Sequence, residues 1–497
     1  MASWTRSRDP AAIDPYLTDE SRMESGRAEQ VAWPKSVEEA AAVLREAAEE
    51  GSPVTVSGAG TGVAGGRVPR GGLVLATDRM NGVLALEESS ESSATGRATL
   101  RVEAGVTLAE IQRVAAERGW LYPPDPTESG AFIGGTLATN ASGPRSFRFG
   151  STRAWVTALS GVLADGTAFR VARGRVRSSG GRIALPLAGG GELRAPAPDW
   201  AMPATSKHAA GYFSRPGMDV MDLLIGSEGT LAVLLQADLL LVRAPSAVMC
   251  GFFFFTKEER ALRFVDRVRG AERGQAADPW CLELFDAASL DLLRQRRRRM
   301  PSGARAAVYM EQPIEGERDE RAASEAWLRL AERTGAEDAA WIADSPADRR
   351  TFRRMRHDVP AAIGEILARR GVTKLATDTA VPRGRLGPWL EDARRRIARD
   401  GIEHVAFGHV GDDHLHVNLL AESKEAWPAA RRAYHDLVRL AVDAGGTVSA
   451  EHGIGKLKRE SLEMLYGPDV MGSMRRVRAA FDPQGRLGRG TMMRNRG

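Results

Sequence analysis

Hydrophobic positions in the amino-terminal half of the chain follow two spacings. Alternation over short stretches is typical of strands with one buried face, and a longer period is typical of helices that pack against a core. A helix is expected over 36–50, because Ser36 can cap its start and Gly51 can end it. Strands are expected over 53–57, 73–77, 99–103 and 155–163, and a second helix over 108–118.

The carboxy-terminal half, beyond a boundary near residues 243–245, alternates apolar strands with amphipathic helices. This alternation predicts a sheet covered by helices and leaves open whether its strands run parallel or antiparallel. Just before the boundary, residues 172–200 carry repeated glycines and scattered arginines, and we expect an irregular excursion there. The strands are expected over 248–255, 307–311, 404–407 and 414–420, and the helices over 261–270, 322–334, 347–369 and 386–399.

Composition then narrows the class of protein. The 497 residues are enough for two or three domains. Lys and Arg number 69 against 64 Asp and Glu, and a net charge of +5 is too small for this length to indicate a nucleic-acid partner. The two cysteines, Cys250 and Cys281, form no CxxC pair, so if the protein uses an iron–sulfur carrier, that carrier is on another chain.

The chain shows neither a secretory signal core nor an apolar run of the roughly 18 residues that a membrane span needs. We therefore expect a cytoplasmic protein. Peripheral contact with the inner membrane stays open, and so does a homodimer.

Glycine-rich stretches suggest a binding site for an anion and a flat ring. Residues 58–66 hold five glycines, and their missing side chains let backbone N–H groups approach a pyrophosphate closely. The spacing is neither GxGxxG opening a helix nor a P-loop, so neither a Rossmann nor a kinase interpretation fits. Small residues over 133–143 would let the backbone pack against a ring system, with hydrogen bonds from Thr136, Asn140 and Ser142.

The densest chemistry lies in HVGDDHLHVN at 409–418 and SAEHGIGK at 449–456. Alternation from His414 onward predicts a strand that places His414 and His416 on one face, and the turn before it can return His409 to the side of His416. Imidazoles that converge with a carboxylate suit a borderline divalent metal such as zinc. The competing interpretation is a solvated polar face of the strand.

In combination, these motifs resemble the FAD-linked oxidases of the vanillyl-alcohol oxidase superfamily, in the branch of D-lactate, glycolate and D-2-hydroxyglutarate dehydrogenases. The resemblance implies an α+β fold with a two-part FAD-binding domain of the PCMH type and a cap domain whose antiparallel sheet is covered by helices. It rests on the glycine loop at 58–66, GGTLATNASG at 134–143, GSEGT at 226–230, GHVGDDHLHVN at 408–418 and AEHGIGK at 450–456. The expected parts are an arm at 1–25, the FAD-binding domain at 26–243, the cap at 244–430 and a segment at 431–497 that returns to the FAD-binding domain.

The resemblance also implies which residues contact FAD. Those around the pyrophosphate are Gly58, Ala59, Gly60, Thr61, Gly62, Gly65 and Gly66. Those along the flavin and ribityl region are Pro124, Asp125, Gly135, Thr136, Asn140, Ser142 and Gly143. Glu228 and Gly229 are expected on the adenine side.

For catalysis, the resemblance implies metal ligands at His409, His416 and Glu451, with zinc favoured and manganese as the alternative, and a catalytic base at His452. The expected substrate-binding residues are Asn418, Arg356, which would pair with a carboxylate, Lys374 as a second cation, and His414. The implied reaction oxidises a 2-hydroxy acid to the 2-oxo acid with the help of the metal and passes a hydride to flavin N5. The electron acceptor would be a quinone, a cytochrome, an electron-transfer flavoprotein or a separate iron–sulfur subunit.

Two alternatives remain: a flavoprotein subunit that works only within a larger electron-transfer complex, and an FAD enzyme of the same fold with another substrate, such as an alkylglycerone-phosphate synthase or an alcohol oxidase. Three departures from the family pattern bear on the site. Asp413-His414 stands where the family has Gly-Asn, which leaves His414 open as a ligand, an acid/base group or a substrate contact. Gly488-Arg-Gly490 replaces a family Asn-Pro-Gly-Lys, and a Lys-Xaa-Asp spacing is not clean around Thr373–Asp378.

Overall fold

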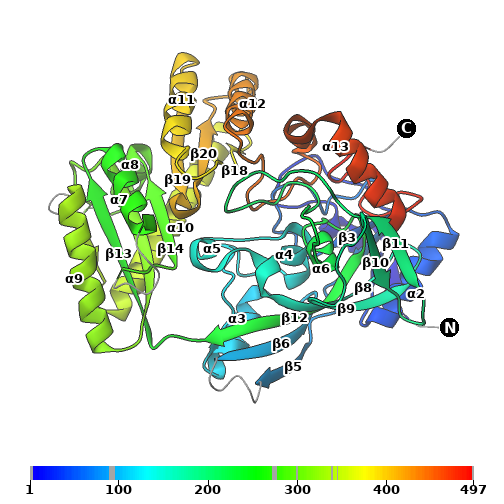
Figure 1. Cartoon of the computed structure of the whole chain (residues 1–497). Helices are drawn as coiled ribbons and strands as arrows, with labels where there is room; N and C mark the ends of the chain where they lie inside the picture. The colour runs from blue at the N-terminus through cyan, green and yellow to red at the C-terminus, as the bar shows by residue number, and fades with distance from the viewer. Residues whose placement is uncertain are drawn as a thin grey trace.

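The computed structural model describes residues 4–88, 96–270, 277–297, 300–336, 340–343 and 345–494. Its elements form an amino-terminal half and a separate cap, with a carboxy-terminal segment between and across them (Figure 1). The cap lies at the left of the view, and the amino-terminal half, into which the last helix folds back, at the right.

A small mixed sheet opens the amino-terminal half. Its order is β1 (Thr5–Ser7), β2 (Gln30–Trp33), β4 (Leu73–Ala76) and β3 (Val54–Ser57), with β1 antiparallel and the other pairs parallel. Helix α2 (Val37–Glu49) packs on this sheet, and its cap is as predicted, because Ser36 Oγ accepts a hydrogen bond from the N–H of Glu39. The arm contributes β1, α1 (Pro10–Ile13) and η1 (Asp14–Tyr16), so it is more ordered than its sequence pattern indicated.

A second, antiparallel sheet completes the scaffold of this half. Its order is β5 (Val83–Glu88), β6 (Arg97–Glu103), β12 (Val233–Arg243), β8 (Val156–Val162) and β9 (Ala168–Ala172), and β7 (Trp120–Leu121) pairs with β12. Its connections contain α3 (Leu108–Glu117), α4 (Ile133–Thr139), α5 (Ser146–Phe149), η3 (Thr152–Trp155) and α6 (Val220–Leu224). The small residues expected to face a ring therefore lie on and just after α4.

The expectation of an irregular excursion at 172–200 is wrong in part. This stretch contains the hairpin β10 (Arg182–Pro186) and β11 (Glu192–Pro196). Ile183 and Leu185 alternate with more exposed residues and are buried in the core of the amino-terminal half, and three glycines at 189–191 supply the positive φ angles of the turn. The apolar residues of these two strands are too few, and too close to glycines, for the sequence pattern to have predicted the strands.

The cap is built on one sheet, and each strand pair in its described residues is antiparallel, as the family resemblance implied. One of its strands carries a run of phenylalanines at 252–255, and Phe252 and Phe253 are fully buried in the core of the cap. The order is β16 (Ala340–Ile342), β13 (Ala247–Phe255), β15 (Ala306–Ile314), β14 (Cys281–Phe285), β19 (Glu403–Gly408), β20 (His414–Leu420) and β17 (Leu375–Ala376), with β18 (Thr379–Ala380) also paired with β20. The covering helices are α7 (Glu258–Gly270), α8 (Ala287–Arg296), α9 (Glu317–Thr334), α10 (Pro346–Arg370) and α11 (Leu386–Arg399).

The carboxy-terminal segment joins the two halves. Helix α12 (Trp427–Asp443) buries Ala433 and Leu437 in the cap core, so the boundary proposed at 430/431 falls inside a helix. Helix α13 (Arg459–Phe481) packs in the amino-terminal half. The connection between them is bonded on both sides: the N–H of Ala209 donates to Ser449 O, and the N–H of Ala450 to Asp378 O. Residues of the EHG motif are thereby held where cap and amino-terminal half meet.

Across the described ranges, none of the helices combines the length and apolarity that crossing a bilayer requires.

Candidate metal and flavin site

The β19–β20 hairpin brings three imidazoles together. Helix η4 (Val410–Asp412) reverses the chain after His409, and Asp413 at φ 52° leads into β20. The ring centroids of His409 and His416 lie 5.7 Å apart, and those of His414 and His416 lie 4.5 Å apart. The predicted turn and the shared strand face are both confirmed.

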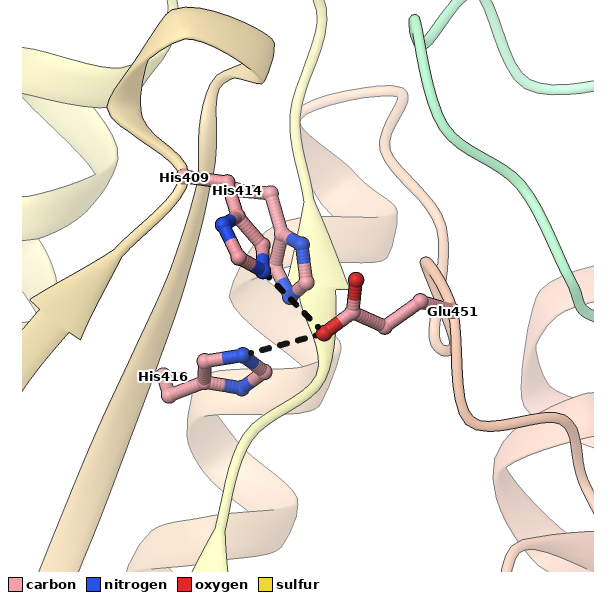
Figure 2. Close-up of side chains that lie close together, drawn as sticks. All are labelled: His409, His414, His416 and Glu451. Carbon is pink, nitrogen blue, oxygen red and sulfur yellow. Dashed lines mark hydrogen bonds and ion pairs between the residues drawn. The ribbon is translucent and has the colours of Figure 1, made fainter. Parts of the chain in front are cut away.

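A carboxylate from the distant EHG motif reaches this cluster. Figure 2 shows Glu451 on its own segment, pointing across to the imidazoles. Its Oε1 lies 3.3 Å from Nε2 of His409 and 3.3 Å from Nε2 of His416. The donor atoms of His409, His414, His416 and Glu451 all lie within 4.8 Å of one another. The three residues that the family resemblance assigned to a metal are therefore neighbours in space.

Two hydrogen bonds fix the orientation of the imidazoles of His409 and His416. His409 Nδ1 lies 2.6 Å from Glu283 Oε1, and His416 Nδ1 lies 3.1 Å from the carbonyl oxygen of Thr377. Each bond turns the opposite ring nitrogen, Nε2, toward Glu451. A carboxylate or carbonyl behind a histidine is the usual second partner of a metal-binding imidazole.

Charge around Glu451 favours its ionised form. Burial alone would raise its pKa, yet Lys207 and His409 hold the pKa well below the usual range. Lys207 is buried, and its Nζ lies 3.0 Å from Glu451 Oε2 and donates to Gly143 O at 3.1 Å. Burial opposes a charged His409, but Glu283 and Glu451 outweigh it and raise the pKa of His409 to about 9. The same negative charges would favour a divalent cation at this point.

The residues present fit such a cation. Three imidazoles and a carboxylate are a donor set that first-row divalent metals accept. His414 is fully buried, and neither of its ring nitrogens has a hydrogen-bond partner among the described residues. A buried imidazole in that state costs free energy that a metal–nitrogen bond would offset.

His452 lies between the cluster and open space. Its Nε2 is 3.5 Å from Glu451 Oε1, its Nδ1 is 3.5 Å from Asp378 Oδ2, and its ring stacks on His416 at 5.4 Å. About a third of its side chain, 35%, is exposed. Burial lowers the pKa of His452 to about 4 against the pull of Asp378 and Glu451, so the ring is neutral near pH 7. Its position suits a group that exchanges a proton with a ligand.

A cavity of about 790 Å³ borders this cluster, near the upper end of the roughly 300–1,000 Å³ of ligand pockets. A Cβ added at Gly62, Gly66 or Gly135 would meet no protein atom within 4 Å, so these glycines leave room that a ligand can fill. The residues expected to contact FAD that line the cavity are Gly58, Ala59, Gly60, Thr61, Gly62, Gly66, Gly135, Thr136, Ser142, Glu228 and Gly229. Lys374, Glu451 and His452 also line it. The glycine loop, the small residues of α4 and the catalytic candidates thus share one cavity, whose size and lining fit a dinucleotide.

The remaining residues expected to contact FAD support its walls instead. Asn140, at φ 50°, ends α4 and accepts a hydrogen bond from the N–H of Arg153 at 3.0 Å. A Cβ at Gly143 would lie 2.0 Å from Asp125 O, so the two segments pack backbone to backbone. Pro124 O accepts a hydrogen bond from Gln112 at 3.4 Å, and Gly65 adopts φ 76° beside Met23.

Glu228 has a structural contact that the sequence did not suggest. Its carboxylate accepts hydrogen bonds from the N–H groups of Ile454 at 2.8 Å and Gly455 at 2.6 Å. Burial raises the pKa of Glu228 to about 7. Glu228 therefore ties the loop after the EHG motif to the wall of the cavity.

The substrate candidates lie in different surroundings. Arg356 is largely buried, with Nε 3.9 Å from Glu283 Oε2 and its guanidinium over the ring of Tyr309. Asn418 Nδ2 donates to Val405 O at 3.3 Å, whereas its Oδ1 has no partner among the described residues. Lys374 faces the cavity directly. These positions keep a cationic binding role open for Arg356 and Lys374.

Several site residues were missed. Lys207 and Glu283 interrupt otherwise apolar or small surroundings, and Glu283 is a charged residue inside the buried strand β14, which was the available signal. Asp378 accepts hydrogen bonds from Lys458 Nζ at 2.6 Å and from the N–H of His452 at 3.0 Å. Lys456 Nζ donates to the carbonyl oxygens of Gly65 and Gly66, at 3.2 and 2.9 Å, and so closes the glycine loop.

The sequence is similar to those of several named proteins over nearly its whole length. The chain is 27% identical over 484 residues to the glycolate oxidase subunit GlcD of Bacillus subtilis, covering 96% of this chain and 91% of that one. It is 30% identical over 475 residues to a D-lactate dehydrogenase of Archaeoglobus fulgidus, covering 93% and 91%. A D-2-hydroxyglutarate dehydrogenase of Xanthomonas citri is 29% identical over 485 residues, covering 96% and 91%.

A solved alkyldihydroxyacetonephosphate synthase shares the fold, with a TM-score of 0.68 at 15% identity over 97% of this chain and 81% of that one. Residues 28–172 match the model of an FAD binding domain, and residues 244–492 match that of the C-terminal domain of FAD linked oxidases. The chain therefore belongs to the family of FAD-linked oxidases, with an FAD-binding domain followed by the family's C-terminal domain.

Proposed function

We propose that this protein is an FAD-dependent dehydrogenase that oxidises a 2-hydroxy acid to the 2-oxo acid with the help of a divalent cation. The observation that carries the proposal is the cluster of His409, His416 and Glu451 at the edge of a glycine-lined cavity. Relatives named D-lactate dehydrogenase, D-2-hydroxyglutarate dehydrogenase and glycolate oxidase subunit support the substrate class.

In this mechanism, bound FAD supplies the acceptor for a hydride, and a bound zinc or manganese ion supplies a Lewis acid for the substrate's oxygens. His409, His416 and Glu451 would hold the cation. His452 takes the proton of the substrate hydroxyl on Nε2, since Nδ1 faces Asp378. General-base catalysis of this kind contributes typically about 10²–10⁴-fold. Asp378 keeps the ring in place and stabilises the positive charge that the ring acquires.

The cationic groups bind the acid itself. Arg356 has the planar guanidinium that pairs with a carboxylate through two hydrogen bonds, and Lys374 brings a positive charge into the cavity. Asn418 Oδ1 offers a hydrogen-bond acceptor on the strand that carries His416. His414, Asp378 and Lys207 are buried, so on their side the cluster is shielded from bulk solvent.

Reoxidation needs an electron acceptor, which we propose to be a quinone, a cytochrome, an electron-transfer flavoprotein or an iron–sulfur subunit. One relative is named as a subunit of glycolate oxidase, which favours a second candidate: a flavoprotein subunit that turns over only with partner chains. We place the protein in the cytoplasm, with peripheral membrane contact and a homodimer as further proposals. A third candidate is an FAD enzyme of the same fold with another substrate, such as an alkylglycerone-phosphate synthase or an alcohol oxidase.

One experiment separates these candidates. The purified flavoprotein is mixed anaerobically with D-lactate, L-lactate, glycolate and D-2-hydroxyglutarate, and the blue absorption of the flavin is followed. Bleaching by at least one acid supports the dehydrogenase, and bleaching without turnover under air or artificial acceptors supports the subunit. A His452→Ala variant should retain the flavin but bleach at least about 100-fold more slowly, whereas a His435→Ala control on α12 should match the wild type. No bleaching with any acid would reject the proposal.

A further inference from the structure

His414 is the residue in the cluster that the family pattern does not explain. It is the first residue of β20, its side chain is 0% exposed, and Nδ1 and Nε2 both lack a hydrogen bond within the described part of the chain. Nε2 makes a long ionic contact with Asp378 Oδ1 at 3.4 Å, outside hydrogen-bond geometry. Leaving a buried polar group without a hydrogen bond costs about 1–3 kcal/mol, so this imidazole would gain from a further partner in the functional state.

His414 lies among the residues that we assign to the metal. Its ring centroid lies 4.5 Å from that of His416 and 5.2 Å from that of His409, and its donor atom lies within 4.8 Å of those of His409, His416 and Glu451 (Figure 2). Because β20 alternates its faces, the side chain at 414 stands beside the one at 416. Four donors from three segments therefore surround one point.

The two other roles left open for His414 fit the structure less well. A group that exchanges a proton with a ligand needs an exposed face, and His452 has one, with 35% of its side chain exposed and a place in the cavity lining. The side chain of His414 is 0% exposed and packs against the rings of His409 and His416. Contact with a cation held by these residues therefore fits His414 better than contact with a substrate.

We propose that His414 is a fourth protein ligand, so that the cation is held by three histidines and one glutamate. This has a consequence for the metal. Catalytic zinc is typically bound by three protein ligands and keeps one position open, and a fourth protein ligand would close its tetrahedron. An ion that accepts six ligands, such as Fe²⁺, Co²⁺ or Mn²⁺, retains two positions. If the proposed function holds, the hydroxyl and one carboxylate oxygen of a 2-hydroxy acid can occupy both, so a six-coordinate ion would bind this substrate where zinc in a closed tetrahedron would not.

Metal binding without substrate tests the donor set. Metal-free wild type, His414→Asn and His414→Ala are titrated with Co²⁺, Mn²⁺ and Zn²⁺, with flavin content as the check on folding and His435→Asn as the control. Replacing a residue that only supports a metal ligand typically weakens metal binding by about 10–100-fold. Loss of a ligand should therefore weaken Co²⁺ and Mn²⁺ binding by at least about tenfold. The His435→Asn control should bind both ions as the wild type does. Unaltered affinity in both His414 variants would overturn the proposal.

The spectrum of bound Co²⁺ gives a second test that needs no variant. Four-coordinate Co²⁺ absorbs much more strongly than six-coordinate Co²⁺, because a tetrahedral field has no inversion centre to forbid its d–d transitions. At wavelengths beyond the flavin band, the wild type should show only weak cobalt absorption, and an intense band would overturn the six-coordinate site. Neither measurement depends on catalysis, so ligation by His414 without flavin reduction would reject the proposed function alone, and flavin reduction without such ligation would reject this proposal alone.

Discussion

The carboxylate of Asp378 lies 3.5 Å from Nδ1 of His452 and accepts a hydrogen bond from the backbone N–H of the same residue at 3.0 Å. It also accepts hydrogen bonds from Ser449 Oγ at 2.7 Å and Lys458 Nζ at 2.6 Å. Burial works against this charge, but His452 and Lys458 hold the pKa of Asp378 well below its usual range. One carboxylate thus fixes both the proposed base and the loop that carries it.

Replacing Asp378 with Asn should impair both stability and chemistry. The neutral amide leaves the buried ammonium of Lys458 without its counter-charge, and breaking a buried pair costs about 3–5 kcal/mol. Urea unfolding should show that loss, and anaerobic flavin reduction should slow by about 10–100-fold because the imidazole loses its orienting partner. Asp436→Asn, which removes a half-exposed pair with Arg396, is the control and should change stability by at most about 1 kcal/mol. Equal behaviour of the two variants would contradict the role given to Asp378.

Replacing Glu283 with Gln tests the orientation of His409. The substitution keeps the volume but removes the charge 2.6 Å behind Nδ1. Divalent metal affinity, measured by titration of metal-free protein, should fall by about 10–100-fold. Glu258→Gln is a matched control, because Glu258 is also a carboxylate in the cap that pairs with an arginine, Arg394, away from the cluster. Equal metal affinity in wild type and Glu283→Gln would show that His409 needs no support from this side.

Replacing Gly135 with Val should separate folding from flavin binding. A Cβ at this position meets no protein atom within 4 Å, but it would project into the cavity that we assign to FAD. The variant should fold with a normal far-UV circular dichroism spectrum and purify with little or no flavin absorbance. Gly472→Val in α13, outside the cavity lining, is the control and should purify with the wild-type flavin content. A yellow Gly135→Val protein would contradict this placement of FAD.

The pH dependence of stability should reveal His208, which hydrogen-bonds to Tyr466 at 3.1 Å. Burial lowers the pKa of His208 from 6.5 to about 4, so the unfolded chain binds a proton that the folded chain does not between these values. Its contribution is therefore complete above pH 6.5 and is lost as the pH falls toward 4, by about 1–3 kcal/mol. Urea unfolding from pH 7 to 4 should show a shallower decline for His208→Asn than for the wild type. Parallel curves would assign the acid sensitivity to other groups.

Local sequence pattern was sufficient for much of the fold. Helix α2 begins after Ser36 and ends before Gly51, as its hydrophobic period and its capping residues both indicated. The β19–β20 hairpin followed from the alternation of polar and apolar residues next to a Gly-Asp turn. The hairpin at 182–196 was missed, because its strands are short and their glycine-rich setting resembles a loop. The antiparallel order of the cap sheet came from resemblance and not from periodicity, since strand direction depends on contacts between segments far apart in the chain.

The candidate site divides in the same way. Histidines and glycines cluster in sequence, so His409, His416 and the glycine loop could be singled out directly. Lys207 and Asp378 could not, because each gains its role only when the cap and the amino-terminal half meet. Glu283 offered a signal only as a charged residue within an apolar strand. The burial of His414 without a hydrogen bond is likewise a property of the folded chain.

The central claim is that a cation held by the histidine–glutamate cluster is required to reduce a flavin in the adjoining cavity. It is tested most directly by a rapid-mixing measurement of anaerobic flavin reduction by the best acid, on the protein before metal removal, after chelation, and after readdition of Mn²⁺, Co²⁺ or Zn²⁺. We predict that chelation leaves the flavin bound but stops its bleaching, and that readdition of at least one of these ions restores it. Full-speed bleaching in protein shown by metal analysis to hold no cation would contradict the account.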